Sequence, residues 1–390
     1  MSVKSEILKE QEHLIQLRRW FHQHPEAPHE EFKTTAKIVE ELEKLGIECE
    51  YLSPTAIAGK IIGKKGAGKV IALRSDTDGL KMEDLKEVDY ASKHLGYCHA
   101  CGHDAHTATL LVAAKVLKEQ EAEFAGEVRL FFQPAEEVGG GADFFVEQGY
   151  LKEVDRIFSV HVVSSYESGK VAITEGPVQA SSDFLEIKVT GRGAHVSTPE
   201  KGADALYIAS QIVVSLQSIV SRNTAPTDTA IVGIGLLEAG TQYNIVAEHA
   251  RLEGTTRAFT MEQRNYINQR VEDIVSQTAA MLGGEATVTF SEFAPPVVND
   301  PDATKEAQQV ANAIFGTENV ITNQEKALGA DDFSMMMNET KGVYAYVGTH
   351  NKDKPNTGLS HHHGLFDIDE EALLASCQLY VDFALLHLKD

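Results

Sequence analysis

Cysteine, positive charge and long apolar runs are scarce in this sequence of 390 residues. Four cysteines are too few to form a disulfide scaffold in a chain of this length. The chain has 35 Lys and Arg against 58 Asp and Glu, a net charge of −23, which argues against partners that require a basic face, such as nucleic acid or an anionic membrane. No run reaches the roughly 18 apolar residues of a membrane span, and residues 1–20 contain no apolar core of a secretory signal. We therefore expect a cytoplasmic protein.

Motifs that two large enzyme classes require are also missing. No Gly-x-Ser-x-Gly elbow is present, so the sequence does not indicate a serine hydrolase. Residues 63–70 nearly match a phosphate-binding loop, but Val70 occupies the position at which that loop needs Ser or Thr to hold magnesium. A strand pattern rather than a helix pattern follows, so we interpret this segment as the turn of a β-hairpin.

Strand and helix patterns alternate along both ends of the chain, which predicts an α/β fold. A helix pattern with Asp104 as its N-cap covers residues 104–117. From 180 to 292 the order changes to strand, helix, two strands, helix and strand, the arrangement of a split βαβ domain. We therefore expect a discontinuous domain of residues 1–179 and 293–390, interrupted by an inserted ferredoxin-like domain of residues 180–292.

The densest group of chemically reactive side chains lies in residues 98–106, which read Cys-His-Ala-Cys-Gly-His-Asp-Ala-His. Cys98 and Cys101 have the spacing of a redox pair or of half a zinc ribbon, but a ribbon needs a second such pair, and the order of elements is unlike a thioredoxin fold. A buried cysteine beside surface histidines is a further alternative. We favour a metal site, because Cys101 and His103 stand two residues apart in front of a helix, where Asp104 can orient a histidine.

Carboxylates and a histidine accompany three other strand patterns. Asp76 and Asp78 follow one strand pattern, and Glu136 and Glu137 follow another, ahead of three glycines. Strand ends are common positions for site residues in α/β folds, and one of two adjacent carboxylates can bind a metal while the other faces a water. Two solvated glutamates are the alternative. His161 lies within an apolar strand pattern, where a lone histidine is more often part of the core than a ligand.

Taken in order, these motifs resemble the M20 family of metallopeptidases and amidohydrolases, in its branch of N-acyl-amino-acid and auxin-conjugate hydrolases. The resemblance covers nearly the whole chain, and its most specific motifs are His99-Ala-Cys101-Gly-His103-Asp104 and Gln133-Pro-Ala-Glu136-Glu137. The other matching segments are 18–26, 74–78, 160–162, 191–195, 240–244, 254–257, 332–334 and 362–366. The resemblance implies a hydrolase whose inserted domain is both a lid and a dimerisation domain.

The resemblance also implies a dinuclear metal centre in the discontinuous domain. Its ligands would be Cys101, His103, Glu137, His161 and His362, with Cys101 bridging the two ions. His362 is chosen because the family's ligand lies four residues before the Phe of the last motif, here Phe366. His361 remains a rival, because Gly364 stands where the motif usually has Pro. Zn²⁺, Mn²⁺, Ni²⁺ and Co²⁺ are all compatible with the centre. Departures from the family pattern at Cys98 and Asp331 are expected to tune the pocket rather than abolish metal binding.

In the mechanism that the resemblance implies, a water held by two divalent ions attacks the carbonyl carbon of an amide. Glu136 would accept the proton of this water and pass it to the leaving amine. Asp78 would steady a metal-binding histidine, whereas Asp76 matches the motif without an evident role. His195 would reach the active site of a partner subunit, so a homodimer or a higher homo-oligomer is expected.

The expected substrate is an N-acyl amino acid, for example an N-acetyl amino acid, whose carboxylate Asn244 and Arg257 would anchor. The products would be a carboxylate and a free amino acid. Two alternatives remain. One is a dipeptidase or aminopeptidase of the same family, in which Asp usually stands at the position of Cys101. The other is a non-catalytic metal-binding or peptide-binding protein on the same scaffold, against which an intact Glu136 beside a complete ligand set argues.

Overall fold

The computed structural model describes residues 4–388, which divide into two compact units. Unit 1 consists of residues 4–178, 298–325 and 331–388, and unit 2 consists of residues 179–297 and 326–330. The short segment 326–330 thus clusters with the inserted part of the chain, although its sequence pattern placed it in the discontinuous domain. No helix within the described residues is long and apolar enough to cross a membrane.

Unit 1 is built on a mixed sheet of eight strands. Their order across the sheet is β1 (Glu48–Tyr51), β2 (Ile57–Ile62), β4 (Glu127–Gln133), β3 (Val70–Asp76), β5 (Arg156–Glu167), β16 (Gly342–His350), β6 (Val171–Ala172) and β15 (Val320–Ile321). The four central strands β4, β3, β5 and β16 run parallel to one another. β3 and β16 are buried over almost their whole length, as is usual for parallel strands that helices cover.

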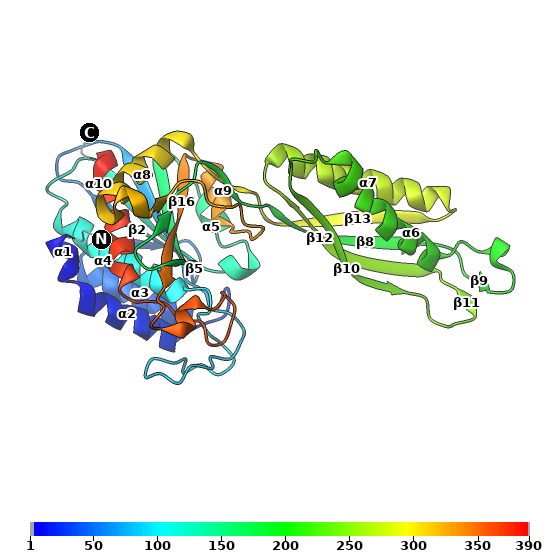
Figure 1. Ribbon diagram of the computed structural model, residues 1–390, viewed down its shortest axis with the longest axis horizontal. Helices are drawn as coiled ribbons and strands as arrows, with labels where there is room; N and C mark the ends of the chain where they lie inside the picture. The colour runs from blue at the N-terminus through cyan, green and yellow to red at the C-terminus, as the bar shows by residue number, and fades with distance from the viewer. Residues whose placement is uncertain (1–3, 389–390) are drawn as a thin grey trace. The chain divides into compact units, whose positions relative to one another are not determined.

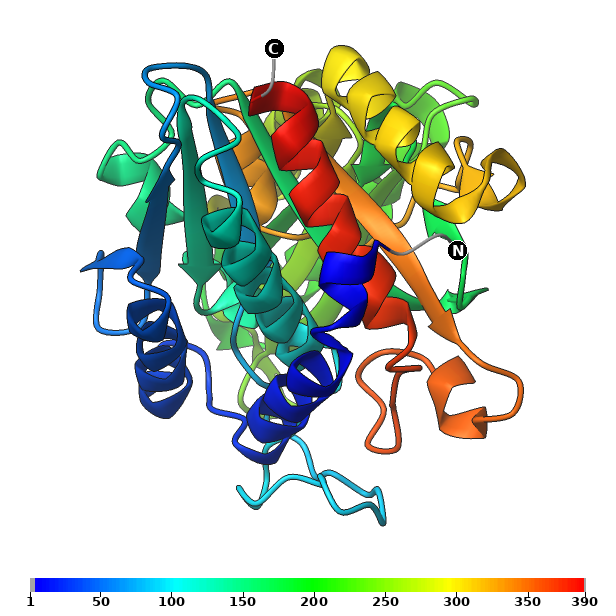
Figure 2. The ribbon, with the colours of Figure 1, turned by 90° about the vertical axis from the view of Figure 1, so that its left-hand side faces the viewer.

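Helices cover the sheet of unit 1. They are α1 (Ser5–Leu8), α2 (Gln11–Gln23), α3 (Phe32–Lys44), α4 (His103–Glu119), α5 (Asp143–Glu147), α8 (Pro301–Phe315), α9 (Phe333–Met337) and α10 (Ala372–Leu388), with short 3-10 helices at Glu136–Val138, Thr317–Asn319 and Pro355–Gly358. Figure 2 shows α4 and α10 side by side against the strands. Both are buried along nearly their whole length. α10 is apolar on every side, whereas α4 also buries polar residues in its first turns, among them His103, Asp104 and His106. The strands and helices confirm the predicted α/β fold.

Unit 2 has a four-stranded antiparallel sheet with two helices on one face (Figure 1). Its strands lie in the order β10 (Ala230–Ala239), β12 (His249–Ala258), β8 (Ser182–Thr190) and β13 (Glu285–Ala294), and its helices are α6 (Ala205–Ser218) and α7 (Met261–Met281). Leu185, Ile187 and Val189 of β8 alternate with more exposed residues and bury one face against the helices. The chain order of these elements is the predicted split βαβ pattern.

Several short elements complete the chain. They are the paired strands β9 (Ala194–His195) and β11 (Ile245–Val246), the paired strands β7 (Gly176–Gln179) and β14 (Val297–Asn299), a 3-10 helix at Pro199–Lys201 and a π-helix at Ile219–Asn223.

The start of α4 differs from the sequence prediction. The helix begins at His103, and its N-cap is Gly102 rather than Asp104. Gly102 has a φ of +91°, and a Cβ at this position would lie 2.3 Å from Cγ2 of Val162 in β5. Only glycine therefore allows this turn to pack so closely on β5. The Asp104 carboxylate is not used as a cap, because it is held by Arg18 and His22.

Candidate active site

The carboxyl ends of the parallel strands and the start of α4 gather the predicted residues of unit 1. These residues are Asp78 just after β3, Glu136 and Glu137 just after β4, His161 in β5, and Cys101 and His103 at the start of α4. This edge of a parallel sheet is where open α/β folds bind their ligands. The fold therefore places side chains from distant parts of the sequence in one cluster.

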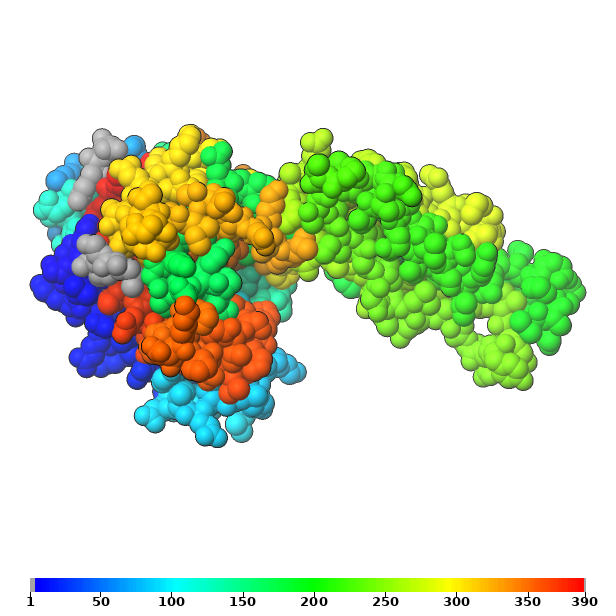
Figure 3. Space-filling view, in the orientation of Figure 1, coloured from blue at the N-terminus to red at the C-terminus, as the bar shows by residue number. Residues whose placement is uncertain are grey.

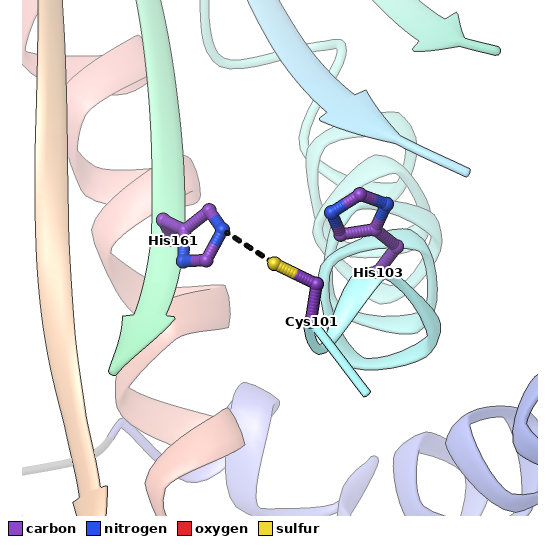
Figure 4. A group of neighbouring side chains, drawn as sticks. All are labelled: Cys101, His103 and His161. Carbon is purple, nitrogen blue, oxygen red and sulfur yellow. Dashed lines mark hydrogen bonds between the residues drawn. The ribbon is translucent and has the colours of Figure 1, made fainter. Parts of the chain in front are cut away.

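Cys101, His103 and His161 form the centre of this cluster (Figure 4). The Cys101 sulfur lies 3.6 Å from Nε2 of His161. Nδ1 of His161 donates to the Val162 carbonyl at 2.7 Å, which leaves the lone pair of Nε2 directed at the cluster. Nδ1 of His103 contacts Asp78 at 3.1 Å, and its buried Nε2 makes no hydrogen bond within residues 4–388. Each ring therefore offers one free nitrogen to a shared position.

Asp78 organises two sides of the cluster at once. One of its carboxylate oxygens accepts both the ring N–H of His103 and the backbone N–H of Glu136 at 3.1 Å. The other oxygen accepts the backbone N–H of Glu137 at 3.0 Å. A carboxylate that fixes the tautomer of a ligating histidine is a usual feature of metal sites.

The Glu136 and Glu137 carboxylates both point toward His103. Oε2 of Glu136 and Oε1 of Glu137 each lie 3.9 Å from Nε2 of His103. Oε1 of Glu137 is buried and has no hydrogen-bond partner in the described part of the chain. Burial, together with the nearby carboxylates of Asp331 and Glu137, raises the pKa of Glu136 well above its ordinary value. Glu136 thus has the raised basicity that a general base needs.

The histidines of the segment 361–363 reach the same cluster. Nδ1 of His361 lies 3.6 Å from the Cys101 sulfur, whereas Nε2 of His362 lies 3.4 Å from Oε1 of Glu137. The backbone N–H of His362 donates to the Ala100 carbonyl at 2.9 Å, which holds this segment against the turn before α4. His361 and His362 therefore approach different candidate ligands, and both are within reach of a metal.

Two surface segments of unit 1 lie next to each other beside these histidines. In Figure 3 the orange segment around residues 351–363 adjoins the light-blue segment around residues 81–97. The Leu85 N–H donates to the Gly364 carbonyl at 2.8 Å. A Cβ at residue 364 would lie 2.8 Å from the Glu83 carbonyl oxygen, so glycine permits this close approach.

The electrostatics of the cluster favour a bound cation. Burial and the carboxylates of Glu137 and Glu136 raise the pKa of the Cys101 thiol well above its ordinary range. Burial acts to lower the pKa of His103, but the carboxylates around it outweigh burial and raise that pKa to about 10. A divalent cation offsets such crowding of negative charge. Thiolate, imidazole and carboxylate ligands suit transition-metal ions. Nε2 of His103 and Oε1 of Glu137 are buried without a hydrogen-bond partner in the described residues, so both can bind a metal ion. The residues therefore fit a metal centre.

The predicted residues of unit 2 lie at its two opposite ends. His195 is exposed in β9, and Asn244 lies beside it, because the Val196 N–H donates to the Asn244 carbonyl at 3.1 Å. Arg257 lies at the end of β12 that pairs with the start of β8, whereas β9 follows the far end of β8. The two ends are separated by roughly 25 Å, the length of eight extended residues. Unit 2 therefore does not bring Asn244 and Arg257 onto one carboxylate.

The sequence matches peptidase family M20/M25/M40 over residues 72–386. The chain belongs to this family. It is 38% identical over 381 residues to an IAA-amino acid hydrolase of Arabidopsis thaliana (ILR1-like 4), which covers 96% of this chain and 86% of that protein. It is 37% identical over 371 residues to the N-acetyl-L-cysteine deacetylase of Bacillus subtilis, with 94% and 86% covered.

A crystal structure of a Bacillus subtilis protein, described as a dinuclear metal binding peptidase from the M20 family, is similar to this chain at a TM-score of 0.85 and 32% identity. The similarity covers 98% of this chain and 99% of that chain. These matches confirm the predicted M20 membership. The protein is a metal-dependent M20 amidohydrolase, a hydrolase that acts on amide bonds.

Sequence analysis of this M20 protein missed the role of His106. Its Nδ1 contacts Asp76 at 2.6 Å, and its Nε2 accepts the Val162 N–H at 2.9 Å. Both ring nitrogens are therefore occupied, and His106 is a structural residue rather than a ligand. Asp76 gains a role as its partner and also accepts from Arg74 at 2.8 Å.

Arg74 is the second residue of this M20 protein that sequence analysis overlooked. It is fully buried in β3, and its guanidinium donates to Asp76, Asp331 and Gln133. An arginine inside an apolar strand pattern was the available signal, because a buried guanidinium requires carboxylate partners. Asp331, which departs from the family pattern, is one of them.

Proposed function

We propose that the protein hydrolyses the amide bond of N-acyl amino acids, such as N-acetyl amino acids, to a carboxylate and a free amino acid at a centre of two divalent ions. The names of the two similar proteins support an N-acyl amino acid as substrate. The proposal rests mainly on two potential groups of metal ligands that share the sulfur of Cys101. Cys101 belongs both to a group with His103 and His161 and to a group with Glu137 and His362.

Because Cys101 belongs to both groups, its sulfur would help to hold both ions. His103 and His161 are the proposed ligands on one side, and Glu137 and His362 are those on the other. Bound divalent ions supply Lewis acidity, which lowers the pKa of water and polarises the amide carbonyl. Zn²⁺, Mn²⁺, Ni²⁺ and Co²⁺ all suit this mixed set of sulfur, nitrogen and oxygen donors.

Glu136 is the proposed general base and acid. The residue is 7% exposed, and its carboxylate faces the ligand cluster. Its backbone N–H donates to Asp78, so a fixed backbone orients the carboxylate. It would accept a proton from the attacking water and deliver it to the nitrogen of the leaving amine. Its raised pKa lets the carboxylate hold that proton between the two transfers.

His195 and Asn244 are proposed to serve the active site of a second subunit in a homodimer. An N-acyl amino acid is much shorter than the sheet of unit 2, so one substrate cannot contact His195 at one end and Arg257 at the other. Residues from two subunits resolve this separation. Arg257 would bind the substrate carboxylate, since its guanidinium donates to the Leu328 carbonyl at 3.3 Å and pairs with no carboxylate among the described residues. Asn244 and His195 would come from the partner.

The proposed interface between subunits is the edge of unit 2. β10 is an edge strand, and the exposed apolar residues Leu206, Tyr207 and Val214 lie on the neighbouring helix α6. An open strand edge beside exposed apolar side chains is typical of an association surface. We also propose a cytoplasmic location, which the four free thiols of the described chain support.

A substrate panel tests the proposal. The metal-free protein is refilled with Zn²⁺, Mn²⁺, Ni²⁺ or Co²⁺ and assayed with N-acetyl, N-benzoyl and indole-acetyl amino acids and with unblocked dipeptides. We expect amine release from the N-acyl substrates and little from the dipeptides. Faster cleavage of dipeptides would assign the protein to the peptidase branch, and stoichiometric metal without any amide hydrolysis would indicate a non-catalytic metal-binding protein.

A further inference from the structure

We propose that Arg18 is a positioning residue that fixes the two ligand-bearing segments of the metal centre relative to each other. This inference rests on the proposed metal centre. One segment is the turn before α4, which carries Cys101 and His103, and the other is the segment that carries His361 and His362. Arg18 itself lies on α2 and touches neither set of ligand atoms.

Arg18 joins both segments through their flanking carboxylates. Its side chain is 1% exposed. Nε donates to Asp104 at 2.9 Å, and Asp104 directly follows the proposed ligand His103. Nη2 donates to Asp367 at 2.8 Å, and Asp367 follows His362 by five residues. A third donor, Nη1, reaches Glu370 at 3.3 Å, just before α10.

Each of the two carboxylates has a second anchor, so the guanidinium lies at the centre of a fixed network. Asp104 also contacts Nδ1 of His22 at 2.6 Å. Asp367 also accepts a hydrogen bond from the Tyr90 hydroxyl at 2.6 Å, and the centre of the Tyr90 ring lies 5.0 Å from the Arg18 guanidinium. Arginine suits this role because its planar fork presents donors in fixed directions to several carboxylates.

The direct contacts between the two ligand segments are one backbone hydrogen bond and the 3.6 Å contact between the Cys101 sulfur and Nδ1 of His361. The His362 N–H donates to the Ala100 carbonyl at 2.9 Å. The Cys101 contact is made by a proposed ligand atom, so the backbone bond is the attachment that is independent of the ligands, and one bond leaves rotation about it free. The link through Asp104, Arg18 and Asp367 supplies a second point of attachment, which sets the orientation. Without the guanidinium, the buried carboxylates of Asp104 and Asp367 would lose the cation that they share. Their like charges would then push the two segments apart.

The neighbouring group of His22, Asp84 and Cys98 does not offer a rival explanation as another cation site. Its ligand atoms lie close enough together for a metal ion. However, the Lys86 ammonium lies 2.8 Å from Asp84 and 3.9 Å from the Cys98 sulfur. The chain therefore supplies its own cation there, and the group extends the ionic network around Arg18.

The test is the binding of Co²⁺ to Arg18→Lys, followed by its absorption spectrum. Lysine keeps the charge but, as a point donor, cannot hold both carboxylates in fixed directions. We expect the variant to bind Co²⁺ about 10 to 100 times more weakly than the wild type, with altered d–d and thiolate-to-metal bands, because the ligand geometry has changed. A matched control is Arg156→Lys, which breaks a bidentate pair with Glu306 at 2.9 and 2.8 Å in unit 1.

The outcomes separate this inference from the proposed function. If the folded Arg18→Lys protein binds Co²⁺ with wild-type affinity and spectrum, Arg18 does not position the centre. The same conclusion follows if Arg156→Lys weakens binding equally, since the loss is then one of general stability. If Arg18→Lys does not fold, Asp367→Asn replaces it, and a wild-type spectrum in that variant overturns the inference. A wild-type protein that binds no Co²⁺ refutes the metal centre itself and the inference with it.

Discussion

The proposed site residues of unit 1 and those of unit 2 differ in how firmly the chain holds them. In unit 1, His103, Asp78 and Glu136 are buried and connected by hydrogen bonds from three separate elements. In unit 2, His195 is exposed, and within the described residues its side chain hydrogen-bonds only to Ser197. A metal centre needs ligands fixed before the ion arrives, whereas an exposed residue at the end of a sheet is suited to contact another surface. The difference supports the proposal that unit 1 performs the chemistry and that His195 of unit 2 serves the site of a partner subunit.

Replacing Glu136 by Gln should have the largest effect. The amide is isosteric but accepts no proton, so we expect kcat to fall by about 10² to 10⁴ while the metal content is unchanged. Steady-state kinetics and metal analysis of the same sample measure this. Glu87→Gln, on the exposed 81–97 segment, is the control. A metal-replete Glu136→Gln enzyme with near-normal kcat would show that another group accepts the proton.

Replacing His195 by Ala should have the next largest effect, and it should change only kcat. We expect kcat to fall by about 10² to 10³, as for loss of one donor to a developing oxyanion. The metal content and the urea midpoint should remain those of the wild type, because the side chain is exposed. Exposed His249 of unit 2 provides a matched His→Ala control. Loss of metal or of stability in His195→Ala would contradict the contrast between the units.

Separate alanine variants of His361 and His362 sharpen the account of unit 1. We expect His362→Ala to weaken metal binding by about 10 to 100 times and to leave one ion bound more loosely than the other. His361→Ala should weaken it less. Competition with a chromogenic chelator measures both affinities. The reverse ranking would make His361 the ligand, in keeping with its 3.6 Å distance from the Cys101 sulfur.

The pH dependence of stability should show how tightly unit 1 is packed with carboxylates. Burial and the Asp78 carboxylate raise the pKa of Glu31 to about 7, from an ordinary value of 4.5. The folded metal-free protein then keeps a proton that the unfolded chain loses, so stability falls as pH rises from 4.5 to about 7. Glu31→Gln should flatten this fall in urea unfolding between pH 5 and pH 8. An unchanged slope would mean that Glu31 titrates normally.

The fold was within reach of sequence reasoning, because its signals are local, whereas the ligand set remains a prediction that the family resemblance implies. The alternation of patterns gave the two kinds of unit, and the segment 98–106 with Glu136-Glu137 pointed to the centre. The surrounding network was not predictable. Asp104 and Asp367 lie 86 and 349 positions from Arg18 in the sequence, and no local pattern encodes such pairing. The prediction that Asp104 caps α4 was wrong for the same reason, because its carboxylate binds the distant guanidinium of Arg18.

Subunit complementation tests the central contrast most directly. Glu136→Gln and His195→Ala chains, each nearly inactive alone, are unfolded together, refolded and reassembled at equal concentration. If His195 serves the partner's site, mixed dimers contain one intact site, and about a quarter of the wild-type activity per subunit should return, because random pairing makes half of the dimers mixed. If the activity stays at the level of the two parent variants while mixed dimers are present, each chain carries its own complete site and the account is wrong.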